Sequence, residues 1–267
     1  MIICPNCKSP LKKETFNTWN NVIYSICKNC KCAYQDPKIE FIYEKDHWEK
    51  AIDPDGVERD FTKERDFRVK NWFGDSIKFV NKLKPGKILD VGCGLGCFLS
   101  GINNDWQKYG FEIGDFPIQY IKNKYPSINL LKNELFNQNL NKETFDVIMF
   151  YHVIEHVEKP EKFLNYFHSL LKKDGYLIVG TPNSRSIIAR LLKRKFRHFG
   201  KQHILLYSPE ALKEKLEINN FICEKIEFPY FKTDYSKLIN IFKLLNPFSK
   251  VAPPFYGNIM TFYAKKK

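Results

Sequence analysis

Long hydrophobic runs are missing from this sequence of 267 residues. No stretch approaches the roughly 18 consecutive apolar residues that a membrane-spanning helix needs. Met1–Pro10 (MIICPNCKSP) also lacks the basic start and apolar stretch of a secretory signal. We therefore expect a cytoplasmic protein. Its hydrophobic content of 43% is sufficient for a sizeable core, and its length suits one large domain with a small accessory one.

Acidic residues are scarce relative to basic ones. The chain has 30 Asp and Glu against 43 Lys and Arg, a formal net charge of +13. Most of the excess lies in residues 185–267, which hold 17 basic and 6 acidic residues. This imbalance favours an anionic partner such as a phosphorylated small molecule, nucleic acid or a membrane surface. A solvated basic surface without such a partner explains it equally well.

A secreted disulfide pattern is also missing, although the chain has eight cysteines. Four of them form two C-x-x-C pairs, Cys4 with Cys7 and Cys27 with Cys30, separated by 19 residues. This spacing is typical of a zinc ribbon, because each pair directs two thiolates at one tetrahedral metal ion. A Cys4 shell leaves no open coordination position, so we predict a structural zinc. A reduced redox pair is the alternative, and Cys32 would be a free thiol or a reserve ligand.

These patterns divide the chain into three regions. Residues 1–36 are predicted to form the zinc ribbon, with a short hairpin between the two cysteine pairs. Residues 37–84 are predicted to be a linker broken by prolines and then a helix, because apolar side chains recur at helical spacing over residues 62–83. Residues 85–267 are predicted to form the main domain, with an insertion at about 232–258 that we interpret as a lid or a dimer contact.

In the main domain, short apolar runs alternate with helical patterns, which is typical of a parallel sheet covered on both faces. The last two runs alternate apolar and polar residues and fit an antiparallel closing pair. We therefore predict an α/β fold with a Rossmann-like, seven-stranded, doubly wound sheet. The expected strands are residues 87–92, 108–113, 128–131, 145–150, 176–182, 221–228 and 259–266.

The first expected strand runs into a glycine-rich turn, LDVGCGLG. Gly92, Gly94 and Gly96 follow a G-x-G-x-G pattern rather than the G-x-G-x-x-G of dinucleotide-binding folds, which disfavours a dinucleotide-dependent oxidoreductase. These glycines let the backbone approach a ligand. Asp90 ends the strand, where a carboxylate would meet a cation rather than a pyrophosphate. Glu112 ends the next strand, where it is placed to bind the two hydroxyls of a ribose.

Five motifs occur in order along the main domain: ILDVGCGLGCFL, GFEIGD, FDVIMFYHVIEHVEKP, LLKKDGYLIVGTPN and QHILLYSPEALKEKLEINNFI. Together they resemble the motifs of class I S-adenosylmethionine-dependent methyltransferases, and the resemblance covers roughly residues 85–230. With the cysteine ribbon in front, the chain is similar to bacterial methyltransferases of sugars, polysaccharides or metabolites. It is also similar to ubiquinone-pathway O-methyltransferases.

The resemblance implies S-adenosylmethionine as the cofactor. The glycines would line its methionine end and Asp90 would hold its amino-acid portion. Glu112 would bind the ribose hydroxyls, and Ile113 would flank the adenine. Asn133 stands where the family usually has an Asp that contacts the adenine. The residues implied to bind the cofactor are Asp90, Gly92, Gly94, Gly96, Glu112, Ile113, Asn133 and Tyr151.

Two histidines and a glutamate follow the fourth expected strand of the main domain. Tyr151 and His152 end that strand and, by the resemblance, would lie beside the reacting methyl group. If a helix begins near His152, Glu155 and His156 lie at i+3 and i+4 on the same face. His203 follows the next strand and emerges at the same edge of the sheet.

Three interpretations of this group stay open. A histidine, His152 or His203, would act as a general base on an acceptor hydroxyl. Alternatively, all four residues would hold a divalent metal that lowers the pKa of the acceptor. Ubiquinone-pathway O-methyltransferases and small-RNA 2′-O-methyltransferases have a similar Glu-x-x-Glu-His pattern, in which this chain has His152 in place of the first Glu. A mixed His3Glu shell suits Zn, Mn, Fe or Co better than Mg. In the third interpretation Glu155 and His156 are structural.

Residues 184–201 are rich in Lys and Arg and are predicted to form one amphipathic helix. Its basic face would dock an anionic substrate, a lipid-linked glycan at a membrane surface or RNA, or it would simply be solvated. Its apolar face would consist of Ile187, Ile188, Leu191, Leu192 and Phe196.

The patterns and the resemblance together predict a methyltransferase that O-methylates a small-molecule or glycan-like, anionic acceptor. RNA methylation is the alternative among enzymes, because the ribbon and the basic C-terminal third also suit nucleic acid. A non-catalytic protein that binds S-adenosylmethionine is the alternative from another class. Peripheral membrane contact is compatible with the sequence, which leaves the oligomeric state open.

Overall fold

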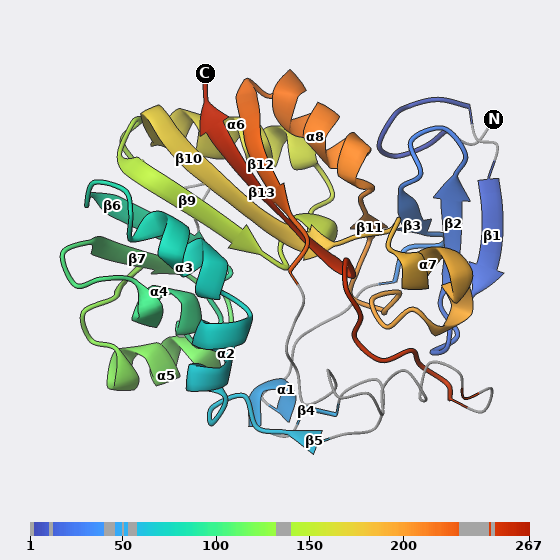
Figure 1. The fold of residues 1–267 in the computed structure, drawn as a ribbon, viewed down its shortest axis with the longest axis horizontal. Helices are drawn as coiled ribbons and strands as arrows, with labels where there is room; N and C mark the ends of the chain where they lie inside the picture. The colour runs from blue at the N-terminus through green and yellow to red at the C-terminus, as the bar shows by residue number, and fades with distance from the viewer. Residues whose placement is uncertain are drawn as a thin grey trace.

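The computed structural model describes residues 3–10, 13–39, 46–49, 51–52, 58–131, 140–229, 246 and 249–267. A large sheet with helices on both sides forms the main body, and a small sheet that contains the N-terminal strands lies beside it (Figure 1). No helix in these ranges is long and apolar enough to cross a membrane.

The large sheet has seven strands in the order β12-β13-β10-β9-β6-β7-β8. The five strands from β10 to β8 are parallel to their neighbours, and β13 pairs antiparallel with both β10 and β12. The predicted doubly wound sheet and its antiparallel closing pair are therefore confirmed. The strands are β6 (Lys87–Val91), β7 (Gln107–Phe111), β8 (Asn129–Leu131), β9 (Phe145–Tyr151), β10 (Leu171–Pro182), β12 (Phe221–Glu227) and β13 (Ile259–Lys266).

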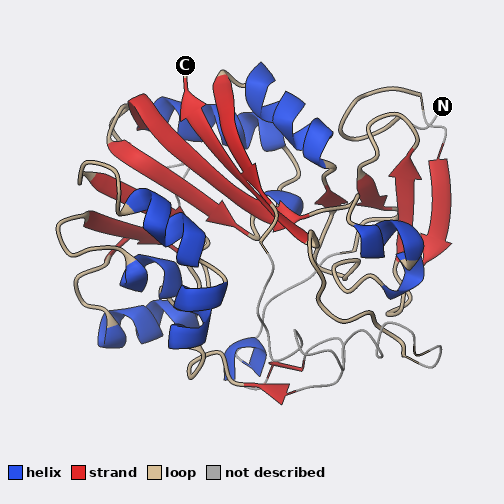
Figure 2. Ribbon diagram, in the orientation of Figure 1, coloured by secondary structure: helices blue, strands red, loops and turns tan. Residues whose placement is uncertain are grey.

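Helices cover both faces of this sheet (Figure 2). Because side chains alternate along a strand, β9 sends Ile148 and Phe150 into one core and Val147 and Met149 into the other. The first core is closed by α6 (Pro160–Leu170) and α8 (Pro209–Ile218). The second is closed by α3 (Gly74–Val80), α4 (Cys97–Gly101) and α5 (Asp115–Lys124). The strand order reverses between β6 and β9, so a crevice is expected beyond the carboxyl ends of these two strands.

The segment in front of the sheet differs from its prediction. Residues 62–83 were predicted as one helix, but they form α2 (Arg65–Asn71) and α3, with a break at Trp72 and Phe73. Gly74 disfavours a continuous helix by about 1 kcal/mol relative to alanine. The break also lets Phe73 pack against Phe98 and Tyr151, with ring centroids 5.8 and 5.0 Å apart. Before α2 lie α1 (Asp46–Glu49), β4 (Ala51–Ile52) and β5 (Glu58–Arg59).

The small sheet has the strand order β1-β2-β3-β11. The strands β1 (Lys13–Asn17) and β2 (Ile23–Cys27) form the predicted hairpin, followed by β3 (Ala33–Gln35). Its fourth strand, β11 (Leu205–Leu206), comes from the region predicted as the main domain. Hydrogen bonds of one sheet therefore cross the predicted division at residue 36.

The basic segment does not form the single amphipathic helix that we predicted for residues 184–201. It contains only α7 (Ile187–Leu191) and the short 3-10 helix η2 (Lys193–Lys195). Ile187 and Leu191 are 54% and 75% exposed, so they do not belong to a buried apolar face. Phe196 and Phe199 instead pack against the small sheet, and this tertiary contact overrides the helical pattern.

The predicted insertion at about 232–258 lies outside the described residues except for 246 and 249–258.

Candidate active site

The turn between β6 and α4 has a backbone that requires glycine. Gly92, Gly94 and Gly96 have φ angles of +73°, +51° and +72°, in the left-handed region. A Cβ atom at Gly92 would also lie 2.7 Å from Cγ2 of Val153. The three predicted glycines therefore form a tight loop that only glycine builds without strain, at the carboxyl end of the first parallel strand.

The carboxylate of Glu112 lies against this loop. It is 8% exposed and accepts hydrogen bonds from the backbone N–H groups of Gly94 (2.8 Å), Ile113 (2.8 Å) and Gly114 (3.0 Å). These bonds hold its two oxygens beside the glycine loop. Ile113 follows it with 68% exposure, an unusual position for a large apolar side chain unless a ligand covers it.

Asp90 is a second buried acid at the end of β6. It is 4% exposed, and burial together with the nearby charge of Glu112 raises the pKa of Asp90 to about 8. Two neighbouring carboxylates beside a glycine loop are suited to a ligand that carries both a positive charge and a diol.

Trp48 of α1 (Asp46–Glu49) packs against the glycine loop. Its atom Cη2 lies 3.1 Å from where a Cβ atom would stand at Gly94. The backbone N–H of Phe61 donates to the Trp48 carbonyl at 3.0 Å, which ties the segment in front of α2 to this position. The sequence pattern did not point to Trp48, which is one of several aromatic residues in the predicted linker.

Tyr151 and His152 follow one another at the end of β9, as predicted. Tyr151 is buried, and Gly180 is needed beside it because a Cβ there would lie 2.2 Å from the Tyr151 ring. His152 has a left-handed backbone with φ of +56°, so no α-helix begins there. A single 3-10 turn, η1 (Ile154–His156), replaces the predicted helix start. The predicted i, i+3 contact between His152 and Glu155 nevertheless forms.

Glu155 is fully buried at the centre of the histidine group. His152 Nδ1 donates to Glu155 Oε1 at 2.9 Å, and the Thr181 hydroxyl donates to Oε2 at 2.9 Å. Burial opposes the negative charge, but the hydrogen bond from His152 and the surrounding histidines lower the pKa of Glu155 to about 2. The carboxylate is therefore ionised at neutral pH, and it holds His152 in one orientation.

His203 folds back onto Glu155. Its Nδ1 donates to the carbonyl of His198 at 2.6 Å, which leaves Nε2, 4.0 Å from Glu155 Oε1, with the lone pair of the neutral ring. Burial, and then the neighbouring His156, lower the pKa of His203 to about 3. The structure therefore brings His152, Glu155 and His203 together, with a neutral His203 facing an ionised carboxylate.

His156 and His198 complete the cluster in different ways. His156 Nδ1 donates to the Gln202 carbonyl at 2.6 Å, so this histidine binds the loop. The His198 ring stacks on His152 with centroids 5.9 Å apart. His198 was missed by the sequence analysis, because in the basic segment nothing distinguishes it from a solvated residue. His152, Glu155 and His203 offer ligand atoms that all lie within 4.8 Å of one another, a set that does not include His156.

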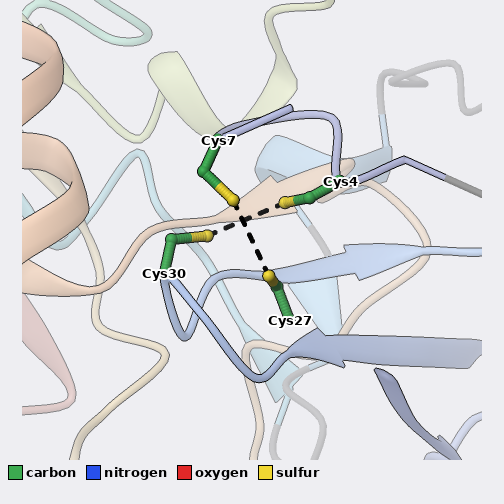
Figure 3. A group of neighbouring side chains, drawn as sticks. All are labelled: Cys4, Cys7, Cys27 and Cys30. Carbon is green, nitrogen blue, oxygen red and sulfur yellow. Dashed lines mark hydrogen bonds between the residues drawn. The ribbon is translucent and has the colours of Figure 1, made fainter. Parts of the chain in front are cut away.

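The four predicted zinc ligands converge at the end of the small sheet (Figure 3). Cys4 Sγ lies 3.7 Å from Cys30 Sγ, and Cys7 Sγ lies 3.8 Å from Cys27 Sγ. Tetrahedral zinc with Zn–S bonds of about 2.3 Å requires sulfur atoms about 3.8 Å apart. The cysteine cluster therefore fits a structural zinc. Cys32 is fully buried and lies outside this group of four.

A family model described as a methyltransferase domain matches residues 65–226, more than half of the chain. The chain belongs to this family. Its sheet is that of class I S-adenosylmethionine-dependent methyltransferases, a fold that solved structures also show. A methyltransferase of this kind from Archaeoglobus fulgidus has a TM-score of 0.55 and 24% identity, and the match covers 77% of this chain and 99% of that one.

Two relatives are named as ubiquinone biosynthesis O-methyltransferases. The mitochondrial protein of Dictyostelium discoideum is 27% identical over 158 residues, covering 49% of this chain and 48% of its own length. The protein of Pelagibacter ubique is 30% identical over 141 residues, covering 48% of this chain and 52% of its own length. This chain thus matches about half the length of each relative.

S-adenosylmethionine fits the acids and glycines of this methyltransferase domain. Its ammonium and sulfonium charges suit the pair of Asp90 and Glu112, and its ribose supplies the diol. Asn133, which the resemblance places beside the adenine, lies outside the described residues.

Proposed function

We propose that the protein transfers a methyl group from S-adenosylmethionine to a hydroxyl of a small-molecule or glycan-like acceptor. The observation that carries this proposal is the hydrogen bond between His152 Nδ1 and Glu155 Oε1 at 2.9 Å, at the end of β9. It lies at the same edge of the sheet as Asp90 and Glu112, the proposed cofactor-binding acids. The two relatives named as O-methyltransferases support the choice of oxygen as the methylated atom.

His152 would act as the general base. Because its Nδ1–H is donated to the ionised Glu155, the lone pair of the neutral ring lies on Nε2, the atom that would take the proton of the acceptor hydroxyl. Bound S-adenosylmethionine supplies an activated methyl group on a sulfonium centre. The protein's further contribution is to orient the acceptor oxygen and to exclude water from it.

Asp90 makes cofactor affinity depend on pH. A cationic ligand favours the ionised carboxylate, but the pKa of Asp90 is raised to about 8 in the free protein. Below pH 8 a proton must therefore leave before the ligand binds. We expect the affinity for S-adenosylmethionine to rise with pH between 6 and 7.5, by up to about tenfold per unit. Titration calorimetry would measure this slope. Asp90→Asn should bind weakly with a flat pH profile, and a pH-independent wild-type affinity would contradict the assignment.

The acceptor class can be tested by turnover. Purified protein would be incubated with S-adenosylmethionine labelled in its methyl group and with cell extract, divided into a small-molecule filtrate and a macromolecular fraction. We expect label in the filtrate or in glycan, on an oxygen identified by mass spectrometry. Label that ribonuclease releases from the macromolecular fraction would favour RNA methylation. Tight binding with no transfer to any fraction would favour the non-catalytic alternative.

A divalent metal at His152, Glu155 and His203 is a second candidate for activation of the acceptor. It is favoured by the lone pair of His203 Nε2 facing Glu155 Oε1 at 4.0 Å. His203→Gln distinguishes the two. A metal ligand is lost with this change, so activity should fall as far as in a His152 variant and the metal content of the protein should fall by one ion. If His152 instead acts as a general base without a metal, His203→Gln should leave the metal content of the protein unchanged.

A further inference from the structure

The loop of residues 200–204 is bound on one side by the candidate active site. The backbone N–H of Ile204 donates to the Glu155 carbonyl at 2.9 Å, and His156 Nδ1 donates to the Gln202 carbonyl at 2.6 Å. His203 lies between these two contacts and faces Glu155. The position of this loop therefore determines where the His203 ring stands relative to the carboxylate.

On its other side the loop is bound by the cysteine ribbon. The hydroxyl of Tyr24, on β2, lies 2.9 Å from the Gly200 carbonyl and 2.6 Å from the His203 carbonyl. The side-chain amide of Gln35, on β3, donates to the carbonyls of Gly200 (3.0 Å) and Lys201 (2.7 Å). Tyr24 is fully buried and Gln35 is 5% exposed, so water does not replace these bonds.

The same two strands lead directly to the cysteine cluster. β2 ends at Cys27, and the main chain around the second C-x-x-C pair is bound to the methyltransferase domain. The hydroxyl of Ser208 donates to the Cys30 carbonyl at 2.8 Å, and that of Ser184 donates to the Lys31 carbonyl at 2.9 Å. A metal that fixes the four cysteines therefore also fixes the strands that hold the loop.

We propose that Tyr24 and Gln35 are positioning residues for methyl transfer, through which the ribbon holds His203 against Glu155. This inference rests on the proposed function of the His152–Glu155 pair. The ribbon would then contribute to catalysis by holding this loop, because its buried polar side chains, Tyr24 and Gln35, bind the loop. Metal held by the four cysteines would then support turnover without contacting the cofactor, whose proposed binding acids, Asp90 and Glu112, lie at the carboxyl ends of β6 and β7.

Two variants test the proposal with little change in volume. Tyr24→Phe removes only the hydroxyl and keeps the packing on Phe199, and Gln35→Met removes only the amide. We expect each to lower kcat by about tenfold or more. The Kd for S-adenosylmethionine should stay within about twofold of wild type. Tyr176→Phe and Gln107→Met are matched controls and should leave kcat unchanged, because the Tyr176 hydroxyl donates to Glu224 at 2.9 Å and Gln107 is at the amino end of β7, away from the candidate site.

A second readout does not depend on turnover. The NMR chemical shifts of the histidine ring protons, compared at a single pH, should differ between wild type and Tyr24→Phe for His152 and His203. The groups that surround them are Glu155, His156, His198 and Arg197. Unchanged histidine ring-proton shifts together with unchanged kcat would overturn the proposal, and so would a parallel loss of kcat and cofactor affinity. A wild-type protein without turnover would instead contradict the proposed function, and the NMR comparison would still decide the positioning role.

Discussion

His152→Asn is expected to lower kcat for methyl transfer by about 10²- to 10⁴-fold, the range that a general base contributes. Asparagine tolerates the left-handed backbone of His152, with φ of +56°, so the change removes the base without adding backbone strain. Steady-state kinetics of methyl transfer would measure the change.

The matched control for this change is His168→Asn. His168 lies on α6, where its ring packs against Phe221 on the covered side of the sheet. It should leave kcat unchanged. Glu155→Gln should lower kcat as well, because an amide holds His152 without stabilising a positive charge on it. Cofactor affinity should stay near wild type in all three variants. A His152→Asn protein that retains wild-type kcat would show that another group, or none, accepts the proton.

Cys27→Ser is expected to remove the bound metal and to destabilise the chain strongly. Structural zinc contributes roughly 10–16 kcal/mol of apparent binding free energy in small zinc domains. Loss of even part of this should lower Tm by more than about 10 °C. Elemental analysis should find one zinc per chain in the wild type and none in the variant, and calorimetry would give the change in Tm.

Cys223→Ser is the control for the zinc prediction, because Cys223 lies on β12, away from the cluster. It should keep one zinc and nearly the wild-type Tm. If the wild type instead holds no metal and forms disulfides within the C-x-x-C pairs in air, the ribbon is a redox site.

Much of the fold could be predicted because apolar runs and their spacing determine which strands are buried. β9 is apolar at consecutive positions because helices cover both faces of the sheet. The cysteine cluster could be predicted because two C-x-x-C pairs at this spacing have few uses other than binding a metal ion. The placement of His152 beside Asp90 and Glu112 could be predicted because the carboxyl ends of parallel strands meet at one edge of the sheet.

Other features depend on contacts that no local pattern encodes. The backbone of His152 is held by its N–H bond to the Gly180 carbonyl, which requires the neighbouring strand. His198 and the loop after it are placed by Tyr24 and Gln35, more than 160 residues earlier in the chain. The amphipathic pattern of residues 184–201 predicted a long helix, but Phe196 and Phe199 gain more by packing against the ribbon.

Titration of S-adenosylmethionine into the wild type and Glu112→Ala would show whether the glycine loop and its acids bind the cofactor. We predict one site per wild-type chain and a Kd at least about 100-fold higher in the variant, because two hydrogen bonds to a charged oxygen are lost. Glu217→Ala, a half-exposed glutamate of α8, should bind like the wild type. Absence of binding to the wild type, or an equal Kd in a folded Glu112→Ala protein, would contradict the account.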